Sequence, residues 1–145
     1  MKRFIRILSF VMAFALLLTT PAFAAETVTP RASNFFGYSS SYFDDVAGSR
    51  VDVWFDVTAL GTMDELGASK IKVQRSTDLD NWTTVQTYYK ADYSQMTDTN
   101  TVTHAACVPF YPSNGYYYRA VVTLYAKNSS GSATMTSYSQ VLDLT

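Results

Sequence analysis

Regular alternation of apolar and polar residues is the feature that most restricts how this chain can fold. In the segment 50–60 every second residue is apolar, from Val51 to Val57, and carboxylates, Trp or Thr stand between them. The segment 116–127 repeats the alternation, with an uncharged set that begins at Tyr116. A period of two places successive side chains on opposite faces of a β-strand. Both segments therefore predict long strands with one buried face, and we expect an all-β fold.

Shorter strand patterns, separated by turn residues, fill the remainder of the chain. The expected strands cover 36–43, 50–60, 70–75, 82–89, 101–108, 116–127 and 134–144, with a polar loop at 88–100. One helical turn is expected at 62–67, because Thr62 and Glu65 have the spacing of a capping box. Leu66 in that turn is expected to cover the end of the core. Asp78 is expected to be a turn residue whose carboxylate binds nearby backbone N–H groups.

The first 24 residues have the three parts of a secretory signal peptide. Three basic residues precede an uncharged apolar run at 7–18, and Ala22-Phe23-Ala24 forms a small-x-small cleavage site. The apolar run is shorter than the roughly 20 residues that a membrane-spanning helix needs. We therefore expect a secreted, extracellular protein with a signal peptide at 1–24, a flexible leader at 25–33 and one β-sandwich domain at 34–145.

Charge and cysteine content exclude several kinds of partner and chemistry. Removal of residues 1–24 takes away 3 of the 11 basic residues and leaves 8 against 12 acidic ones, a net charge of −4. Nucleic acids and anionic membrane surfaces both require clustered Lys and Arg. We therefore expect no nucleic-acid partner and no membrane insertion after signal cleavage. No metal-ligand or catalytic motif is found, so no metal, no cofactor and no enzymatic activity is expected.

Cys107 and His104 are the single members of their kinds in the chain. A Cys–His nucleophile pair would need both, but residues three apart on one strand point to opposite faces. One cysteine also excludes an internal disulfide. We expect Cys107 to be a small, unreactive hydrophobic residue of the core and His104 to lie on the surface.

The motif Phe110-x-Pro112-x-x-x-Tyr116 resembles the Leu-x-Pro-x-x-x-Tyr that leads into the sixth strand of fibronectin type III domains. Ala126-x-Asn128-x-x-Gly131 is similar to the motif at the end of that strand, although the strand between the two motifs is longer here. The resemblance implies an immunoglobulin- or fibronectin-III-like antiparallel β-sandwich of about seven or eight strands. It also implies that Tyr116 forms a tyrosine corner, and that Cys107 occupies an inward aliphatic position.

Two further segments, Gly61 to Gln74 and Gly115 to Arg119, are similar to stretches of uncharacterised small exported proteins of Gram-positive bacteria. That resemblance implies export and a bacterial origin, and it implies no activity.

Outward-facing aromatic and basic side chains remain as candidate ligand-binding residues. Tyr117, Arg119 and Tyr125 share the outward positions of the strand 116–127, and Trp54 is expected on the opposite sheet. Planar rings beside hydrogen-bonding groups suit a sugar or a protein partner, and cross-strand packing is the alternative explanation for each ring.

The sequence therefore predicts a non-enzymatic extracellular interaction protein whose partner is an unidentified protein or glycan. Three alternatives remain open. They are a carbohydrate-binding module, a small secreted hydrolase that uses converged carboxylates, and a structural subunit that assembles through its edge strands.

Overall fold

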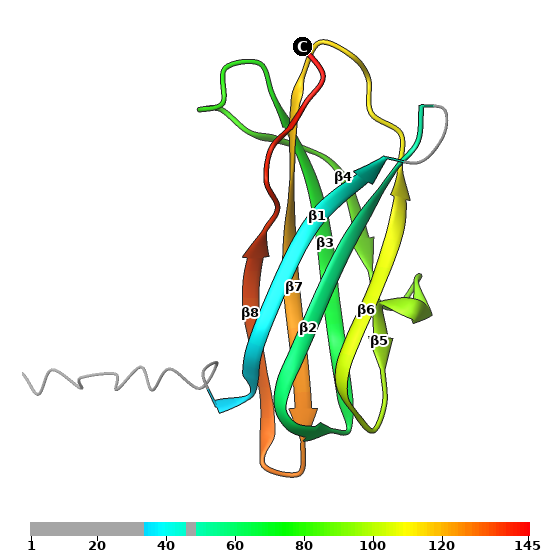
Figure 1. Ribbon diagram of the computed structural model, residues 1–145, viewed down its shortest axis with the longest axis vertical. Helices are drawn as coiled ribbons and strands as arrows, with labels where there is room; N and C mark the ends of the chain where they lie inside the picture. Colours follow the sequence, from blue (N-terminus) through cyan, green and yellow to red (C-terminus); the bar gives the residue numbers. More distant parts are fainter. Residues whose placement is uncertain (1–33, 46–48) are drawn as a thin grey trace, which may run out of the picture.

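Two antiparallel β-sheets packed against each other form the fold, as the computed structural model shows for residues 34–45 and 49–145 (Figure 1). The expected signal peptide and leader lie outside the described residues. The strands are β1 (Phe36–Asp45), β2 (Val51–Met63), β3 (Glu65–Ser76), β4 (Thr83–Tyr89), β5 (Thr97–Asp98), β6 (Thr101–Phe110), β7 (Tyr117–Asn128), β8 (Gly131–Tyr138) and β9 (Leu142–Asp143). The expectation of an all-β, antiparallel fold is confirmed.

Sheet A has the strand order β1-β2-β6, and sheet B has the order β4-β3-β7-β8. The short strands β5 and β9 extend sheet B, where they pair with β3 and β7 respectively. In Figure 1 the strands of sheet A pass in front of those of sheet B, so that each sheet has an inner face toward the other and an outer face toward solvent.

The core lies between the two inner faces and is supplied by the alternating positions that the sequence identifies. In β2, Val53, Phe55 and Val57 are completely buried. In β7 the buried set is Tyr118, Ala120, Val122, Leu124 and Ala126. Burial of one whole face on each strand explains why both long segments alternate so regularly, since a shift of one position would expose every core side chain.

The helical turn expected at 62–67 is absent, and that prediction is wrong. Only Asp64 separates the end of β2 from the start of β3, so the chain crosses between the sheets with no room for a helical turn. The Glu65 carboxylate accepts a hydrogen bond from Lys90 Nζ at 2.7 Å and does not cap a helix. Leu66 is fully buried in β3, so its expected position at the core is confirmed.

The turn before β4 follows the expectation for Asp78. Its Oδ1 accepts hydrogen bonds from the backbone N–H groups of Asp80 at 3.0 Å and Asn81 at 2.8 Å. Its Oδ2 accepts one from the Asn81 amide at 2.7 Å. The hydrogen bonds from Asn81, together with those from Ser76 and Asp80, hold the pKa of Asp78 well below its ordinary value. The turn therefore carries a fixed, charged carboxylate.

Two segments depart from the expected strand boundaries. The loop expected at 88–100 contains a 3-10 turn, η2 (Ser94–Met96), followed by β5, and Met96 is completely buried. The strand expected at 134–144 is interrupted after β8. There Ser139 Oγ accepts a hydrogen bond from the Ala120 N–H at 2.8 Å. This side chain takes the place of a backbone carbonyl in the ladder. Pairing with β7 therefore stops after β8 and resumes at β9.

The hydrogen bond expected of Tyr116 is made by Tyr118, so the assignment of the tyrosine corner to Tyr116 is wrong. The Tyr118 hydroxyl donates to the Ser113 carbonyl at 2.9 Å and accepts from the Ser113 N–H at 3.0 Å. Tyr116 precedes β7 and lies edge-on against the Tyr118 ring at 6.3 Å between centroids. Tyr118 holds the inward position because it shares the alternation of the buried residues of β7.

Tyr118→Phe is therefore expected to lower the free energy of unfolding. Each hydrogen bond contributes about 0.5–1.5 kcal/mol, and a buried partner left unsatisfied costs about 1–3 kcal/mol. Denaturant unfolding should show a lower midpoint at an unchanged slope. The matched control is Tyr116→Phe, which removes a hydroxyl without a hydrogen bond to any described residue and should leave the midpoint unchanged. If Tyr116→Phe lowered the midpoint and Tyr118→Phe left it unchanged, Tyr116 would be the tyrosine-corner residue.

Candidate functional site

A cluster of aromatic, basic and amide side chains lies on the outer face of sheet B and centres on Arg119. The Arg119 Nε donates a hydrogen bond to Gln74 Oε1 at 2.8 Å. Its guanidinium carbon lies 4.3 Å from the centroid of the Trp82 ring and 5.8 Å from that of Tyr138. We name these four residues, Gln74, Trp82, Arg119 and Tyr138, the Arg119 cluster.

Strand register brings the members of the Arg119 cluster together. Gln74 of β3 is the direct cross-strand partner of Arg119 of β7. Tyr138 of β8 pairs with Val121, two residues further along β7 on the same face, and such diagonal neighbours are within reach of long side chains. The turn before β4 supplies Trp82, whose Nε1 donates to the Leu79 carbonyl at 2.9 Å.

The arrangement leaves the guanidinium group of Arg119 oriented and able to bind further groups. Arginine carries five N–H donors in a rigid plane, and the contact with Gln74 uses one of them. Stacking on an aromatic ring contributes about 0.5–1 kcal/mol at an exposed site. Gln74 is itself held, because its Nε2 donates to Thr84 Oγ1 at 3.3 Å. The cluster is therefore prearranged for a ligand that offers acceptors and a flat surface.

Tyr117 and Tyr125 lie on the same outer face as Arg119, but only Tyr117, two residues away along β7, is next to the Arg119 cluster. Both have the outward position that the alternation predicts, and both are half-buried. Tyr125 is six residues from Arg119 along β7, a separation of about 20 Å in a strand. Its ring is covered by Lys90, whose Nζ lies 4.2 Å from the ring centroid.

Trp54 lies on the outer face of sheet A, as expected, and is separate from the other three candidate residues. Its ring is nearly parallel to that of Tyr42, with centroids 6.3 Å apart and an interplanar angle of 5°. The neighbouring Asp52 is not a free carboxylate, because Arg50 binds its two oxygens at 2.8 and 3.0 Å. Cross-strand packing therefore accounts for most of the Trp54 environment.

The expected orientations of Cys107 and His104 are reversed in the structure. Ala106 and Val108 are the buried neighbours on β6, so Cys107 is half-exposed on the outer face of sheet A, 3.8 Å from Asp52 Oδ2. Burial and the nearby Asp52 raise the pKa of the Cys107 thiol, which lowers the fraction of reactive thiolate.

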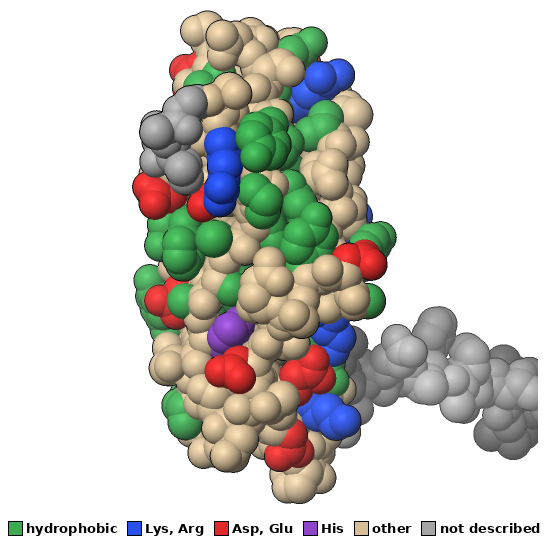
Figure 2. Space-filling model, turned by 90° about the vertical axis from the view of Figure 1, so that its right-hand side faces the viewer, with side chains coloured by type: hydrophobic (Ala, Val, Ile, Leu, Met, Phe, Trp, Pro, Cys, Tyr) green, Lys and Arg blue, Asp and Glu red, His purple; other side chains and the backbone are tan. Residues whose placement is uncertain are grey.

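His104 points inward on the same strand, with its ring 5.7 Å from the Phe55 ring. Its Nε2 lies 2.8 Å from the Gln95 carbonyl of η2. Part of this side chain still reaches the surface, because the one histidine of the chain is visible in the view of Figure 2. Cys107 and His104 therefore lie on opposite faces, as expected, with the two faces exchanged.

Trp82 and Tyr138 are the cluster residues that the sequence analysis missed. Tyr138 belongs to the outward set of the last long strand, and Trp82 stands at the end of a turn, but nothing in either segment points to Arg119. A β3–β4 register and a β7–β8 register would have been needed to bring them together. The turns between β3 and β4 and between β7 and β8 are short, and their length was the sequence feature that could have indicated these pairings.

The two outer faces differ in charge. Lys70, Lys72 and Lys127 occupy outward positions of β3 and β7 on the face of sheet B that carries Arg119, and Lys72 is the nearest of them to Arg119 in the ladder. On sheet A the outward positions hold Asp44, Asp52 and Asp56. The surface around the Arg119 cluster is therefore more basic than the opposite face of the sandwich.

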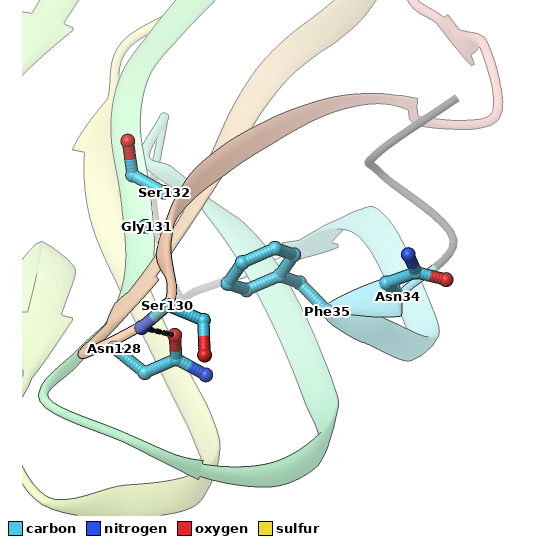
Figure 3. Close-up of a pocket in the computed structure, with 6 residues that line it drawn as sticks. All are labelled: Asn34, Phe35, Asn128, Ser130, Gly131 and Ser132. Atoms are coloured by element: carbon cyan, nitrogen blue, oxygen red, sulfur yellow. Dashed lines mark hydrogen bonds between the residues drawn. The ribbon is translucent and has the colours of Figure 1, made fainter. Parts of the chain in front are cut away.

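The pocket in Figure 3 lies beside the β7–β8 turn and has a volume of about 340 Å³. Its lining residues are Asn34, Phe35, Asn128, Ser130, Gly131 and Ser132. The Asn128 Oδ1 already accepts a hydrogen bond from the Ser130 N–H at 2.8 Å within the turn. None of the lining side chains is a carboxylate, a histidine or a cation, so this pocket offers no acid–base pair.

Among the residues that the structure describes, no group of three His, Cys, Asp or Glu side chains is placed to hold a metal ion. In the same part of the chain no helix is long and apolar enough to cross a membrane. Comparison of the sequence and the structure with family models, curated proteins and solved structures found no match.

Proposed function

We propose that this chain is an exported, non-enzymatic interaction protein, and that it recognises an extracellular protein or glycan through the outer face of sheet B. The observation that carries the proposal is the Arg119 cluster, a guanidinium group anchored by Gln74 and lying 4.3 and 5.8 Å from the centroids of two aromatic rings. Export is proposed from the signal-peptide pattern of residues 1–24.

The strand order supports a sandwich of the immunoglobulin or fibronectin type III kind. When the seven long strands are lettered A to G in chain order, sheet A contains A-B-E and sheet B contains D-C-F-G. Constant-type immunoglobulin domains contain A-B-E-D and C-F-G. The two arrangements differ only in the fourth strand, which here pairs with the third strand, β3.

Prearrangement makes the Arg119 cluster a better candidate for recognition than the other exposed rings. Side chains that are already ordered lose less conformational entropy when a ligand binds. Trp, Tyr and Arg are also the residues that most often dominate binding energy at interfaces. Tyr138 is 61% exposed and is accessible to a ligand. Lys72 next to the cluster, and Lys70 further along the same face, favour a partner that carries negative charge.

Arg119→Ala and Trp82→Ala are expected to weaken ligand binding about thirtyfold or more, the effect of losing a central contact of about 2 kcal/mol. The measurement is a titration with a ligand found on a glycan array or among purified cell-surface proteins. Thermal unfolding should show that both variants remain folded, since neither residue belongs to the core.

Trp54→Ala is the matched control, because it removes a tryptophan from the opposite outer face. Binding lost in this variant and kept in Arg119→Ala would assign recognition to sheet A and contradict the proposal. If the protein hydrolysed a bound glycan and this activity required its carboxylates, the proposal would be wrong and the protein would be a hydrolase. Selective binding of glycans would specify the alternative of a carbohydrate-binding module.

A further inference from the structure

The strand β8 differs from the other edge strands of the two sheets. Apart from the two-residue strands β5 and β9, the outermost strands among those described are β1, β4, β6 and β8. Exposed edges usually carry charges, proline or bulges that prevent pairing with another chain. The strand β1 has a bulge at Gly37 and carries Asp44, β4 has a bulge at Val85, and β6 contains Pro109.

None of these protections is present on β8. Its register with β7 is continuous from Asn128 opposite Gly131 to Val121 opposite Tyr138, without a bulge. The strand contains no proline, and the whole segment 129–142 contains no charged residue. In Figure 1 β8 forms one margin of sheet B, with no other described strand beside it on the open side.

The hydrogen-bond pattern shows which residues of β8 present free backbone groups. The Ser139 N–H donates to the Ala120 carbonyl at 3.0 Å, so this position is bonded to β7. Bonded and non-bonded pairs alternate along an antiparallel ladder. It follows that four residues direct their N–H and C=O groups away from β7. They are Ser132, Thr134, Thr136 and Tyr138, and all four are exposed.

We propose that β8 pairs antiparallel with β8 of a second copy of this chain, around a two-fold axis at Met135. This register places Thr134 opposite Thr136 of the second copy and Ser132 opposite Tyr138. The backbone N–H and C=O groups that point away from β7 in one copy then meet the same kind of groups in the other. Each such pair exchanges two backbone hydrogen bonds. The two copies of sheet B become one continuous sheet.

Charge and shape favour a second copy as the occupant of this edge. Self-pairing around a two-fold axis places β8 only against the residues of another β8, and an uncharged strand meets no charge repulsion there. The half-buried Ala133 and Met135, which pack against the core, are further covered, because Met135 lies opposite Met135 of the second copy and Ala133 lies opposite its Ser137. The Thr134–Thr136 pairs are of a kind that stabilises sheets.

The first test is the mass of the purified protein in sedimentation equilibrium across a wide concentration range. We expect a dimer that dissociates on dilution. Hydrogen exchange gives a reading that needs no variant, since the amides of Thr134 and Thr136 should exchange more slowly as the dimer forms. A monomer at every concentration would overturn the proposal, and so would exchange rates at these amides that do not depend on protein concentration.

Charge substitutions on the edge test the register. The double variant Thr134→Lys with Thr136→Lys places like charges opposite each other and should be monomeric. The double variant Thr134→Lys with Thr136→Glu places opposite charges in the same pairs and should dimerise. The matched control is Thr123→Lys on β7, the ladder partner of Thr136 within the sheet, which should leave the dimer intact.

Circular dichroism should show the same β-sheet spectrum for the three variants. A dimer that survives the double lysine variant, or a double variant with opposite charges that stays monomeric, would exclude this pairing. Strand addition by an unrelated extended peptide to a protein that remains monomeric would also overturn the proposal.

Discussion

Gly67→Ala is expected to lower the free energy of unfolding by about 3 kcal/mol or more, since a strained backbone and an overpacked contact each cost about 1–3 kcal/mol. Gly67 has a φ of +153°, a conformation that glycine adopts far more readily than residues with a side chain. An added Cβ would also meet the Met96 carbonyl oxygen and lie 2.7 Å from the Thr97 Cα. The substitution therefore strains β3 and displaces η2 and β5 together.

The reason for this close approach is the buried Met96. Its side chain enters the core from η2, which directly precedes β5, and the backbone of β5 can pair with Gly67 only if no side chain stands between them. We expect the amides of residues 94–98 to lose protection from hydrogen exchange first. That local loss would distinguish displacement of the loop from general weakening of the fold.

Gly61→Ala is the matched control for Gly67→Ala. Gly61 is exposed in β2, and an added Cβ there would meet no atom within 4 Å. Guanidinium unfolding of the two variants should give a much lower midpoint for Gly67→Ala and an unchanged midpoint for Gly61→Ala. Equal midpoints would mean that the contact between Gly67 and Met96 is not made in solution.

Phe55→Ala is expected to destabilise the protein by about 3–5 kcal/mol, the cost of removing a large aromatic side chain from a core. Phe55 is completely buried in the middle of β2. Its ring also supports the inward-pointing ring of His104, so the cavity would extend toward η2. Denaturant unfolding measures the loss directly.

Trp54→Ala on the same strand provides the comparison. Trp54 is larger than Phe55, but it lies on the outer face of sheet A, where cross-strand contacts contribute about 0.2–1 kcal/mol. We therefore expect the removal of the larger side chain to cost less stability. If Trp54→Ala were the more damaging substitution, the assignment of inner and outer faces on β2 would be wrong.

Side-chain orientation was predictable from the sequence where polar and apolar residues contrast. On β2 and β7 the alternation identified the buried face of each strand, because carboxylates and Lys cannot share the core with Val and Leu. On β6 the apolar residues Val108 and Phe110 alternate with Cys107 and are buried together with Ala106, whereas the inward position expected of Cys107 followed the resemblance to fibronectin type III domains. The strand's alternation therefore places Cys107 outward and puts His104 on the inner face with Val108 and Phe110.

A lack of contrast between polar and apolar residues explains why the hydrogen bond expected of Tyr116 is made by Tyr118. Three consecutive tyrosines, Tyr116 to Tyr118, offer no contrast in polarity, so the position that reaches the Ser113 backbone depends on where β7 begins. The helical turn at 62–67 failed for a related reason. A capping-box spacing is a local signal, and the need to cross between two sheets through Asp64 outweighed it.

The sequence by itself determined that this chain forms antiparallel strands, which residues of the two longest strands are buried, and that Tyr117, Arg119 and Tyr125 face outward together. These properties depend on neighbours within one strand. The tertiary structure alone decided that Trp82 and Tyr138 join Arg119, that Met96 enters the core over Gly67, and that β8 is left as an unprotected edge. Each of these depends on register between segments distant in sequence, and the free energy of that register is distributed over two whole sheets.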